Sequence, residues 1–222
     1  MAEPHVLAVR RMAWLFAVGS ACFALGVPLS VWLPSQPTVA AVVYFVGSVF
    51  FTSAATIQMW LARKDLPSLH DLPVVRRVLH LLGYRAVAWS SAWIQWFGTL
   101  AFNVTTWRGV VVAGDASGVT PELVWRPDAV GSVLFLVSSA IAMRPEVRGF
   151  RHAHVRNRSW LIAASNLLGS VFFGLSAVGA FPEPTSDGMW NLFWSNAGTF
   201  AGALCFLLGS LLLLPPRHPA PS

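Results

Sequence analysis

The chain is predicted to be an all-α, polytopic membrane protein with six transmembrane helices arranged as three parallel hairpins. Two features of its composition predict this class. Apolar residues make up 55% of the 222 residues and charged residues only 11%, whereas roughly 25% charged residues is usual in soluble domains. Six apolar runs approach or exceed the roughly 20 residues that a helix needs to cross the hydrocarbon. The chain is therefore expected to form a single integral membrane domain over residues 1–222.

The six transmembrane helices are expected, in order, at residues 12–33, 39–62, 86–107, 128–143, 160–181 and 191–214. The first two are joined by a tight turn over residues 34–37, which contains two prolines. The fourth is short for a full crossing and is expected to extend outward through Val124 and Trp125, or to lie where the bilayer is thinner. Pro127 is expected near its start, where a missing N–H costs little. Residues 108–127 are expected to form the longest outer loop, and the proline-rich stretch 182–188 another outer turn. The hairpins then cover about 12–62, 86–143 and 160–214.

The distribution of basic residues predicts the orientation of these helices. Of the 15 Lys and Arg residues, only Arg108 and Arg126 fall on one side, and the others fall in the termini or in the two loops 63–85 and 144–159. The positive-inside rule then places both termini and both basic loops in the cytoplasm. The expected partners of these loops are anionic lipid headgroups, and not nucleic acid. Cys22 and Cys205 lie within apolar runs and are expected to be small buried residues rather than a disulfide.

The second and third hairpins repeat one another at a spacing of 71 residues. The repeated positions include Arg85 and Arg156, Trp89 and Trp160, Gly98 and Gly169, Phe102 and Phe173, Gly131 and Gly202, and Phe135 and Phe206. An internal repeat of this kind predicts a repeated structural unit. The first hairpin carries a similar pattern, Gly19 to Phe23 and Gly47 to Phe51, with a shorter spacing between its two glycines. A third, more diverged copy is therefore a hypothesis.

Two of these small-residue runs carry a resemblance to a known family. They are Val46-Gly-Ser-Val-Phe-Phe-Thr-Ser-Ala-Ala-Thr-Ile-Gln58 and Asn166-Leu-Leu-Gly-Ser-Val-Phe-Phe-Gly174. The chain resembles the YrhK-like bacterial membrane proteins in the paired helices, and not in the inner loops. The resemblance implies a bacterial inner-membrane location. That family has no established activity, so it implies no catalytic residue.

Residues that could carry chemistry are few. No Asp, Glu, Lys, Arg or His falls in the middle of an expected helix, which argues against a proton-coupled transporter, because such proteins keep charges in the membrane for that purpose. His152 and His154 alone do not make a zinc site, which needs three or four converging ligands. A lipid-modifying site in that basic loop is an alternative hypothesis. The positive-inside rule alone also accounts for a basic loop at this position. No catalytic, cofactor-binding or metal-binding residue is predicted.

Amides within the expected helices form the candidate polar site, namely Gln95, Asn103, Asn166 and Asn196. Interhelical hydrogen bonding explains such residues, each bond contributing roughly 1 kcal/mol. The alternative is a ligand site near the pseudo-symmetry axis, formed by the equivalent Gln95 and Asn166.

Glycines at matching positions are expected to let helices approach closely in lipid: Gly47, Gly98, Gly131, Gly169, Gly198 and Gly202. A narrow pore lined by small residues is the alternative interpretation. The sequence thus favours a non-enzymatic inner-membrane protein that assembles with copies of itself or with other membrane proteins. An uncoupled carrier or channel for a small neutral solute or lipid is the alternative.

Overall fold

The computed structural model describes residues 2–64, 87–114, 118–148, 157–183 and 188–214. These residues form six α-helices: α1 (Ala2–Trp32), α2 (Pro37–Lys64), α4 (Val87–Ala113), α5 (Pro121–Arg148), α6 (Arg158–Gly179) and α7 (Leu192–Leu213). Within the described part of the chain there is no strand, and one isolated bridge joins Pro182 to Met189. The predicted all-α class is therefore confirmed.

Five of the six helices, all except α4, are long and apolar enough to cross a membrane. This agrees with a multi-pass membrane protein. Helix α4 has the length, at 27 residues, but it carries several hydroxyl and amide side chains, among them Ser90, Ser91, Gln95 and Asn103. These polar groups lower its hydropathy, and two of them, Gln95 and Asn103, have partners on neighbouring helices.

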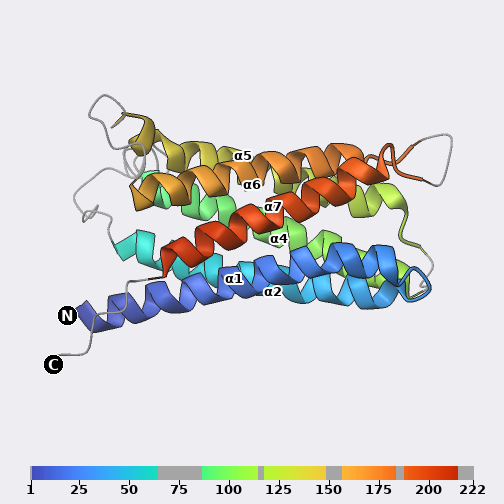
Figure 1. Cartoon of the computed structure of the whole chain (residues 1–222), viewed down its shortest axis with the longest axis horizontal. Helices are drawn as coiled ribbons and strands as arrows, with labels where there is room; N and C mark the ends of the chain where they lie inside the picture. Colours follow the sequence, from blue (N-terminus) through green and yellow to red (C-terminus); the bar gives the residue numbers. More distant parts are fainter. Residues whose placement is uncertain (1, 65–86, 115–117, 149–156, 184–187, 215–222) are drawn as a thin grey trace, which may run out of the picture.

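The helices form a closed ring of roughly parallel rods (Figure 1). Each helix packs against the next in the chain, and α7 returns to pack against α1. Among the described residues, each helix backbone therefore packs closely against two neighbouring helices, and only side chains meet across the ring. The start of α1 and the end of α7 lie at the same end of the bundle (Figure 1).

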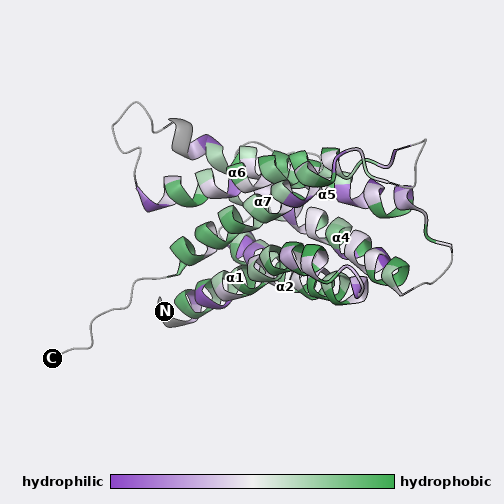
Figure 2. Cartoon of the chain, turned by 45° about the vertical axis from the view of Figure 1, so that its right-hand side comes forward, coloured by the Kyte–Doolittle hydropathy of each residue, from purple (hydrophilic) through white to green (hydrophobic). Residues whose placement is uncertain are grey.

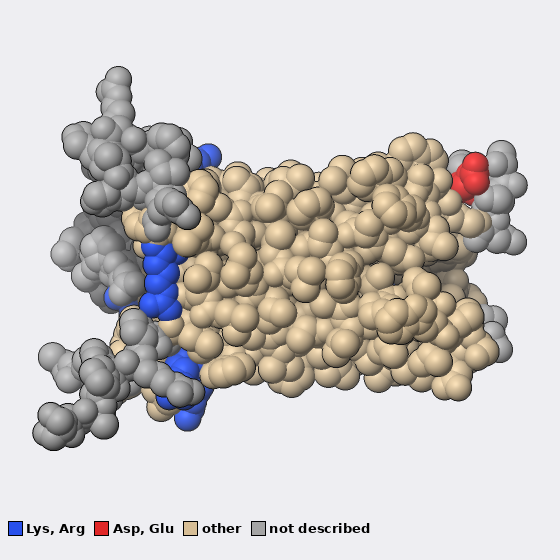
Figure 3. Space-filling model, viewed as in Figure 1, with Lys and Arg blue, Asp and Glu red and all other residues tan. Residues whose placement is uncertain are grey.

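The outer surface is apolar along most of its length, and charge is confined to the ends. Figure 2 shows hydrophobic residues along the middle of the helices. In the view of Figure 3, Lys and Arg gather at the end where α1 starts, whereas the visible acidic residues lie at the opposite end. An apolar belt between two polar ends is the surface that a bilayer requires.

Two of the predicted helix boundaries are wrong by many residues. Helix α1 begins at Ala2 and not near residue 12; its Pro4 falls in the first turn, where proline is tolerated. Helix α5 begins at Pro121, so Pro127 lies inside the helix and not at its start. The predicted outer loop over residues 108–127 shrinks accordingly to the stretch between Ala113 and Pro121.

An arginine explains how the interior proline of α5 is accommodated. Pro127 has no N–H, so the carbonyl of Leu123 loses its usual helical donor four residues on. The guanidinium of Arg108 donates to that carbonyl from α4 at 2.5 Å. Arg108 and Asp128 thus lie inside helices, in the part nearer the end opposite the start of α1, and the prediction of an outer-loop position for Arg108 is wrong.

The middle of each basic loop lies outside the described residues, and so do His152 and His154. Cys22 and Cys205 are free and half-buried, in agreement with the expectation that they form no disulfide.

Candidate functional site

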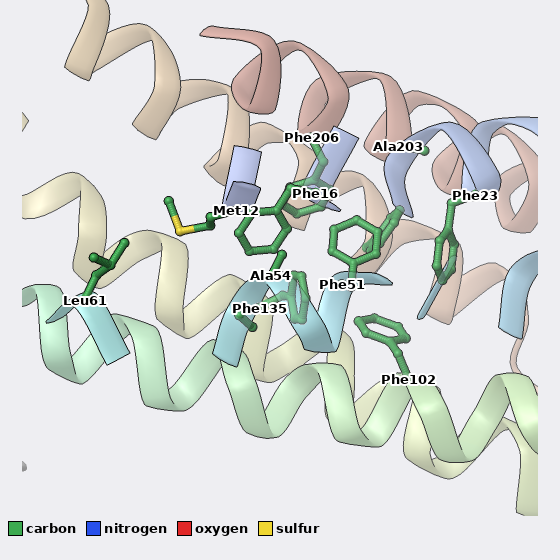
Figure 4. Close-up of a cluster of buried hydrophobic side chains, with 12 residues drawn as sticks. Met12, Phe16, Phe23, Phe51, Ala54, Leu61, Phe102, Phe135, Ala203 and Phe206 are labelled. Carbon is green, nitrogen blue, oxygen red and sulfur yellow. The ribbon is translucent and has the colours of Figure 1, made fainter. Parts of the chain in front are cut away.

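The centre of the ring is filled by six phenylalanine rings, one from each helix. They are Phe23, Phe51, Phe102, Phe135, Phe173 and Phe206, and none is more than 6% exposed. Figure 4 shows labelled members of this group converging from different helices. We call these six side chains the phenylalanine core.

The rings of the phenylalanine core form two triangles. Phe23, Phe102 and Phe173 contact one another with ring centroids 5.7–6.4 Å apart. The second triangle, built from the other three rings, has separations of 5.7–6.3 Å.

Each ring of one triangle also contacts a ring of the other from the next helix along the chain, at 5.1–5.6 Å. These separations fall in the 4.5–7 Å range of favourable aromatic pairs. The six rings therefore pack against one another around the axis of the bundle at this level.

Glycines bring the paired helices close enough for these rings to meet. In α4 and α5, Gly98 lies against the Phe135 ring and the Gly131 carbonyl, and Gly131 lies against the Phe102 ring and the Gly98 carbonyl. A Cβ added at Gly98 would come within 2.6 Å of the Phe135 ring. Each glycine thus makes room for the phenylalanine of the opposite helix.

The same reciprocal contact occurs in the other two helix pairs. Gly169 and Gly202 lie against Phe206 and Phe173 in α6 and α7, and Gly19 and Gly47 lie against Phe51 and Phe23 in α1 and α2. Gly198 makes an even closer backbone contact, since an added Cβ would lie 2.6 Å from the Phe172 carbonyl oxygen. The glycines named from the sequence therefore all occupy close helix contacts.

A layer of hydroxyl groups lies beside the phenylalanine core, and its members bond within their own helices. Three fully buried hydroxyl residues each follow a glycine directly: Ser20 in α1, Thr99 in α4 and Ser170 in α6. Their hydroxyls donate to the carbonyls of Phe16, Trp96 and Asn166, respectively, at 2.7–2.9 Å. Because each donor is used internally, this layer presents no free hydroxyl hydrogen to a ligand.

The two equivalent amides Gln95 and Asn166 face the seam of their own helix pair. The Ser138 hydroxyl donates to the Ser91 carbonyl at 2.8 Å and lies 3.5 Å from the Gln95 Oε1 atom. The Asn166 Oδ1 atom lies 2.9 Å from the position that a Cβ on Gly209 would take. Each amide therefore faces its partner helix within its own pair, Gln95 toward α5 and Asn166 toward α7.

The other two predicted amides lie in different surroundings. Asn103 faces α2, where its Nδ2 atom donates to the Thr52 hydroxyl at 2.9 Å. Asn196 lies in the first turns of α7, near the end of the bundle opposite the start of α1, and is half-buried. The four predicted amides thus do not form one site.

A row of polar contacts between α2 and α4 was not predicted from the sequence. The Ser48 and Thr106 hydroxyls are 2.9 Å apart, Asn103 bonds to Thr52, and the Trp96 indole donates to the Thr56 hydroxyl at 3.0 Å. The hydroxyl residues of α2 recur every four residues, which places them on one helix face. That spacing is the signal that could have located this seam.

Two further polar groups lie in the described interior, on Trp125 and Gln58. The Trp125 indole donates to the Ala177 carbonyl at 2.8 Å and links α5 to α6. The Oε1 atom of Gln58 is buried without a hydrogen-bond partner among the described residues. No group of three or more His, Cys, Asp or Glu residues with metal-ligand geometry occurs in the described part of the chain.

Comparison of the chain with protein-family models, with curated proteins and with solved structures found no match.

Proposed function

We propose that the chain is a multi-pass inner-membrane protein that works without catalysis, as an assembly or interaction partner of other membrane proteins or of its own copies. The observation that carries this proposal is the filled interior. Six contacting rings occupy the centre of the bundle, and the candidate amides bond to or face adjacent helices. The outer surface is then what the molecule offers to partners.

The outer surface also has the character that this role needs. Large apolar side chains such as Leu25, Val133 and Leu208 are more than half exposed on three different helices. Within a bilayer, helix association is driven by van der Waals packing and interhelical hydrogen bonds rather than by a hydrophobic effect. A rigid bundle with such faces is suited to lateral packing.

The proposed architecture is three parallel hairpins, of which the last two are the 71-residue repeat and the first is a diverged third copy. The equivalent Gly and Phe contacts in the three helix pairs support this proposal. Contacts nearer the turns support it further, because Thr105 donates to the Val124 carbonyl and Ser176 to the Ser195 carbonyl. The two donors are 71 residues apart in the sequence, and so are the two acceptors. The similarity to YrhK-like proteins belongs to the same proposal.

The proposed orientation places both termini in the cytoplasm. The Lys and Arg residues at the end where α1 starts support it (Figure 3). Thiol labelling tests it in a variant without Cys22 and Cys205. A cysteine at Thr120 should react with an external impermeant reagent, whereas a cysteine at Ser159 should not. Labelling in the reverse pattern would rule out this orientation.

The assembly role is tested by photo-crosslinking in membranes. A photoreactive residue at Leu25, Val133 or Leu208, which face outward, should form discrete protein adducts from at least one position. The matched control is Phe135, which is buried in the phenylalanine core and should form none. Adducts to lipid alone from every outward position would refute the assembly role.

The alternative role, an uncoupled carrier or channel, is tested by solute flux. Liposomes that contain the protein should swell in glycerol or urea no faster than protein-free liposomes, because the phenylalanine core occupies the centre of the bundle. Faster swelling that Gln95→Leu or Asn166→Leu abolishes would favour transport instead.

A further inference from the structure

A shallow groove opens on the outer face of α1 and α2, close to the basic end of the bundle. Its volume is about 450 Å³, and its lining is almost entirely apolar. The lining residues are Leu7, Arg10, Arg11, Trp14, Leu15 and Ile57. This volume lies in the range of about 300–1,000 Å³ typical of small-ligand sites.

The groove has an apolar floor and a charged rim. Leu15 and Ile57 pack against the hydrophobic core and therefore form the floor. Trp14 is half exposed, and Arg10 and Arg11 are exposed. Because Trp14 follows Arg10 by four residues, it lies on the same side of α1, about 6 Å deeper along the helix.

Helix α2 ends in a further cation, Lys64, which does not line the groove. Lys64 follows Ile57 by seven residues, which is close to two helical turns and places both on one face. The Lys64 ammonium lies 3.3 Å from the centre of the Trp60 ring. Such a cation–π contact holds the ammonium at this level of the helix.

We propose that this groove binds one anionic phospholipid, with its phosphate between Arg10 and Arg11 and an acyl chain along Trp14, Leu15 and Ile57. The order of groups along the groove supports this occupant. Cations lie at the level where a headgroup sits, an indole lies at the membrane interface, and aliphatic side chains follow toward the hydrocarbon. A zwitterionic lipid would fill the apolar part equally but would gain less from the two arginines. The proposal rests on the membrane placement proposed above, and not on the assembly role.

The test uses the full-length protein in vesicles and the fluorescence of its tryptophans. Phosphatidylglycerol with brominated acyl chains is mixed into a phosphatidylcholine host, and the reverse mixture has brominated phosphatidylcholine at the same mole fraction. Bromine quenches an indole that it contacts. The Trp14 signal is obtained as the difference between the protein and its Trp14→Phe variant, since the chain has eleven tryptophans.

Brominated phosphatidylglycerol should quench Trp14 more strongly than brominated phosphatidylcholine does. Arg11→Gln should reduce the relative affinity for phosphatidylglycerol by at least about fivefold, because it removes a charge-assisted hydrogen bond to the lipid phosphate. Arg63→Gln is the matched control, because it removes one charge at the same end of the bundle but lies outside the groove lining. It should leave the preference unchanged. Raising the salt concentration should weaken the preference, because screening shortens the range of the attraction.

A second variant separates the acyl-chain contact from the charge. Ile57→Phe should fill the groove floor and reduce quenching by both brominated lipids, without changing any charge or adding a tryptophan. Equal quenching by the two lipids in the unmodified protein would overturn the proposal. So would equal effects of Arg11→Gln and Arg63→Gln, because general surface attraction would then explain the preference. A failure of the crosslinking test of assembly would leave these lipid measurements unaffected.

Discussion

The contact at Gly198 leads to the sharpest stability prediction. A Cβ at this position would lie 2.6 Å from the Phe172 carbonyl oxygen and 2.7 Å from the Ser176 amide nitrogen. Carbon atoms in favourable contact lie about 3.5–4.0 Å apart. Both clashing atoms belong to the α6 backbone, which cannot rotate away as a side chain can, so α6 and α7 would have to separate.

The magnitude follows from two opposing effects. Overpacking typically costs about 1–3 kcal/mol, and a rigid backbone partner favours the upper end of that range. Alanine is more favourable than glycine within a helix by about 1 kcal/mol. We therefore expect Gly198→Ala to lower the free energy of unfolding by about 2 kcal/mol, the difference between these two terms.

Gly174 provides a matched control in α6, on the other helix of the same pair. An added Cβ there would meet nothing within 4 Å, so only helix propensity changes, and Gly174→Ala should be more stable by up to about 1 kcal/mol. Gly131→Ala should fall between them, since its nearest contacts would be at 3.2 Å and include the Phe102 ring.

The measurement is unfolding in mixed detergent micelles with increasing dodecyl sulfate, followed by tryptophan fluorescence and circular dichroism. The order of stability should be Gly174→Ala, then Gly131→Ala, then Gly198→Ala. Equal stability of the Gly198 and Gly174 variants would refute the argument that close backbone contact requires glycine in this seam.

Two further stability predictions use the same assay. Phe135→Ala should destabilise the bundle by about 3–5 kcal/mol, because it leaves a cavity at a site that is 2% exposed. Phe193→Ala, at a side chain that is 69% exposed, should cost far less. Similar costs for the two variants would contradict a central packing role for Phe135. Asn103→Leu should cost about 1 kcal/mol through loss of its bond to Thr52, and Asn103→Leu combined with Thr52→Val should cost little more than the single variant; additive losses would show that the two side chains are not coupled.

The local elements could be predicted from sequence because their cause is local. An apolar run of about 20 residues forms a helix in a membrane, since each backbone polar group needs a partner within the segment. That reasoning located all six helices, although it placed the start of α1 ten residues late and the start of α5 seven residues late. The α5 error arose because Pro127 was read as a helix start, whereas Arg108 supplies the missing donor from another helix.

The candidate site could be predicted only in part, because its contacts join residues that lie on different helices. The glycines could be recognised because small residues are needed wherever two helices approach closely. The grouping of Gln95 with Asn166 could not be decided, because equivalent positions in a repeat need not be neighbours. Gln95 faces α5 and Asn166 faces α7, so each amide lies in the seam of its own helix pair.

The sequence by itself determined the apolar helices, the 71-residue spacing between matching positions, the close-contact glycines and the distribution of basic residues along the chain. Only the tertiary structure decided that α7 packs against α1 to close the ring, that six phenylalanines meet at its centre, and that the polar residues of α4 bond to α2. The physical reason is that helix formation depends on hydrogen bonds between residues four apart, whereas lateral packing in lipid depends on the shapes of surfaces far apart in the chain.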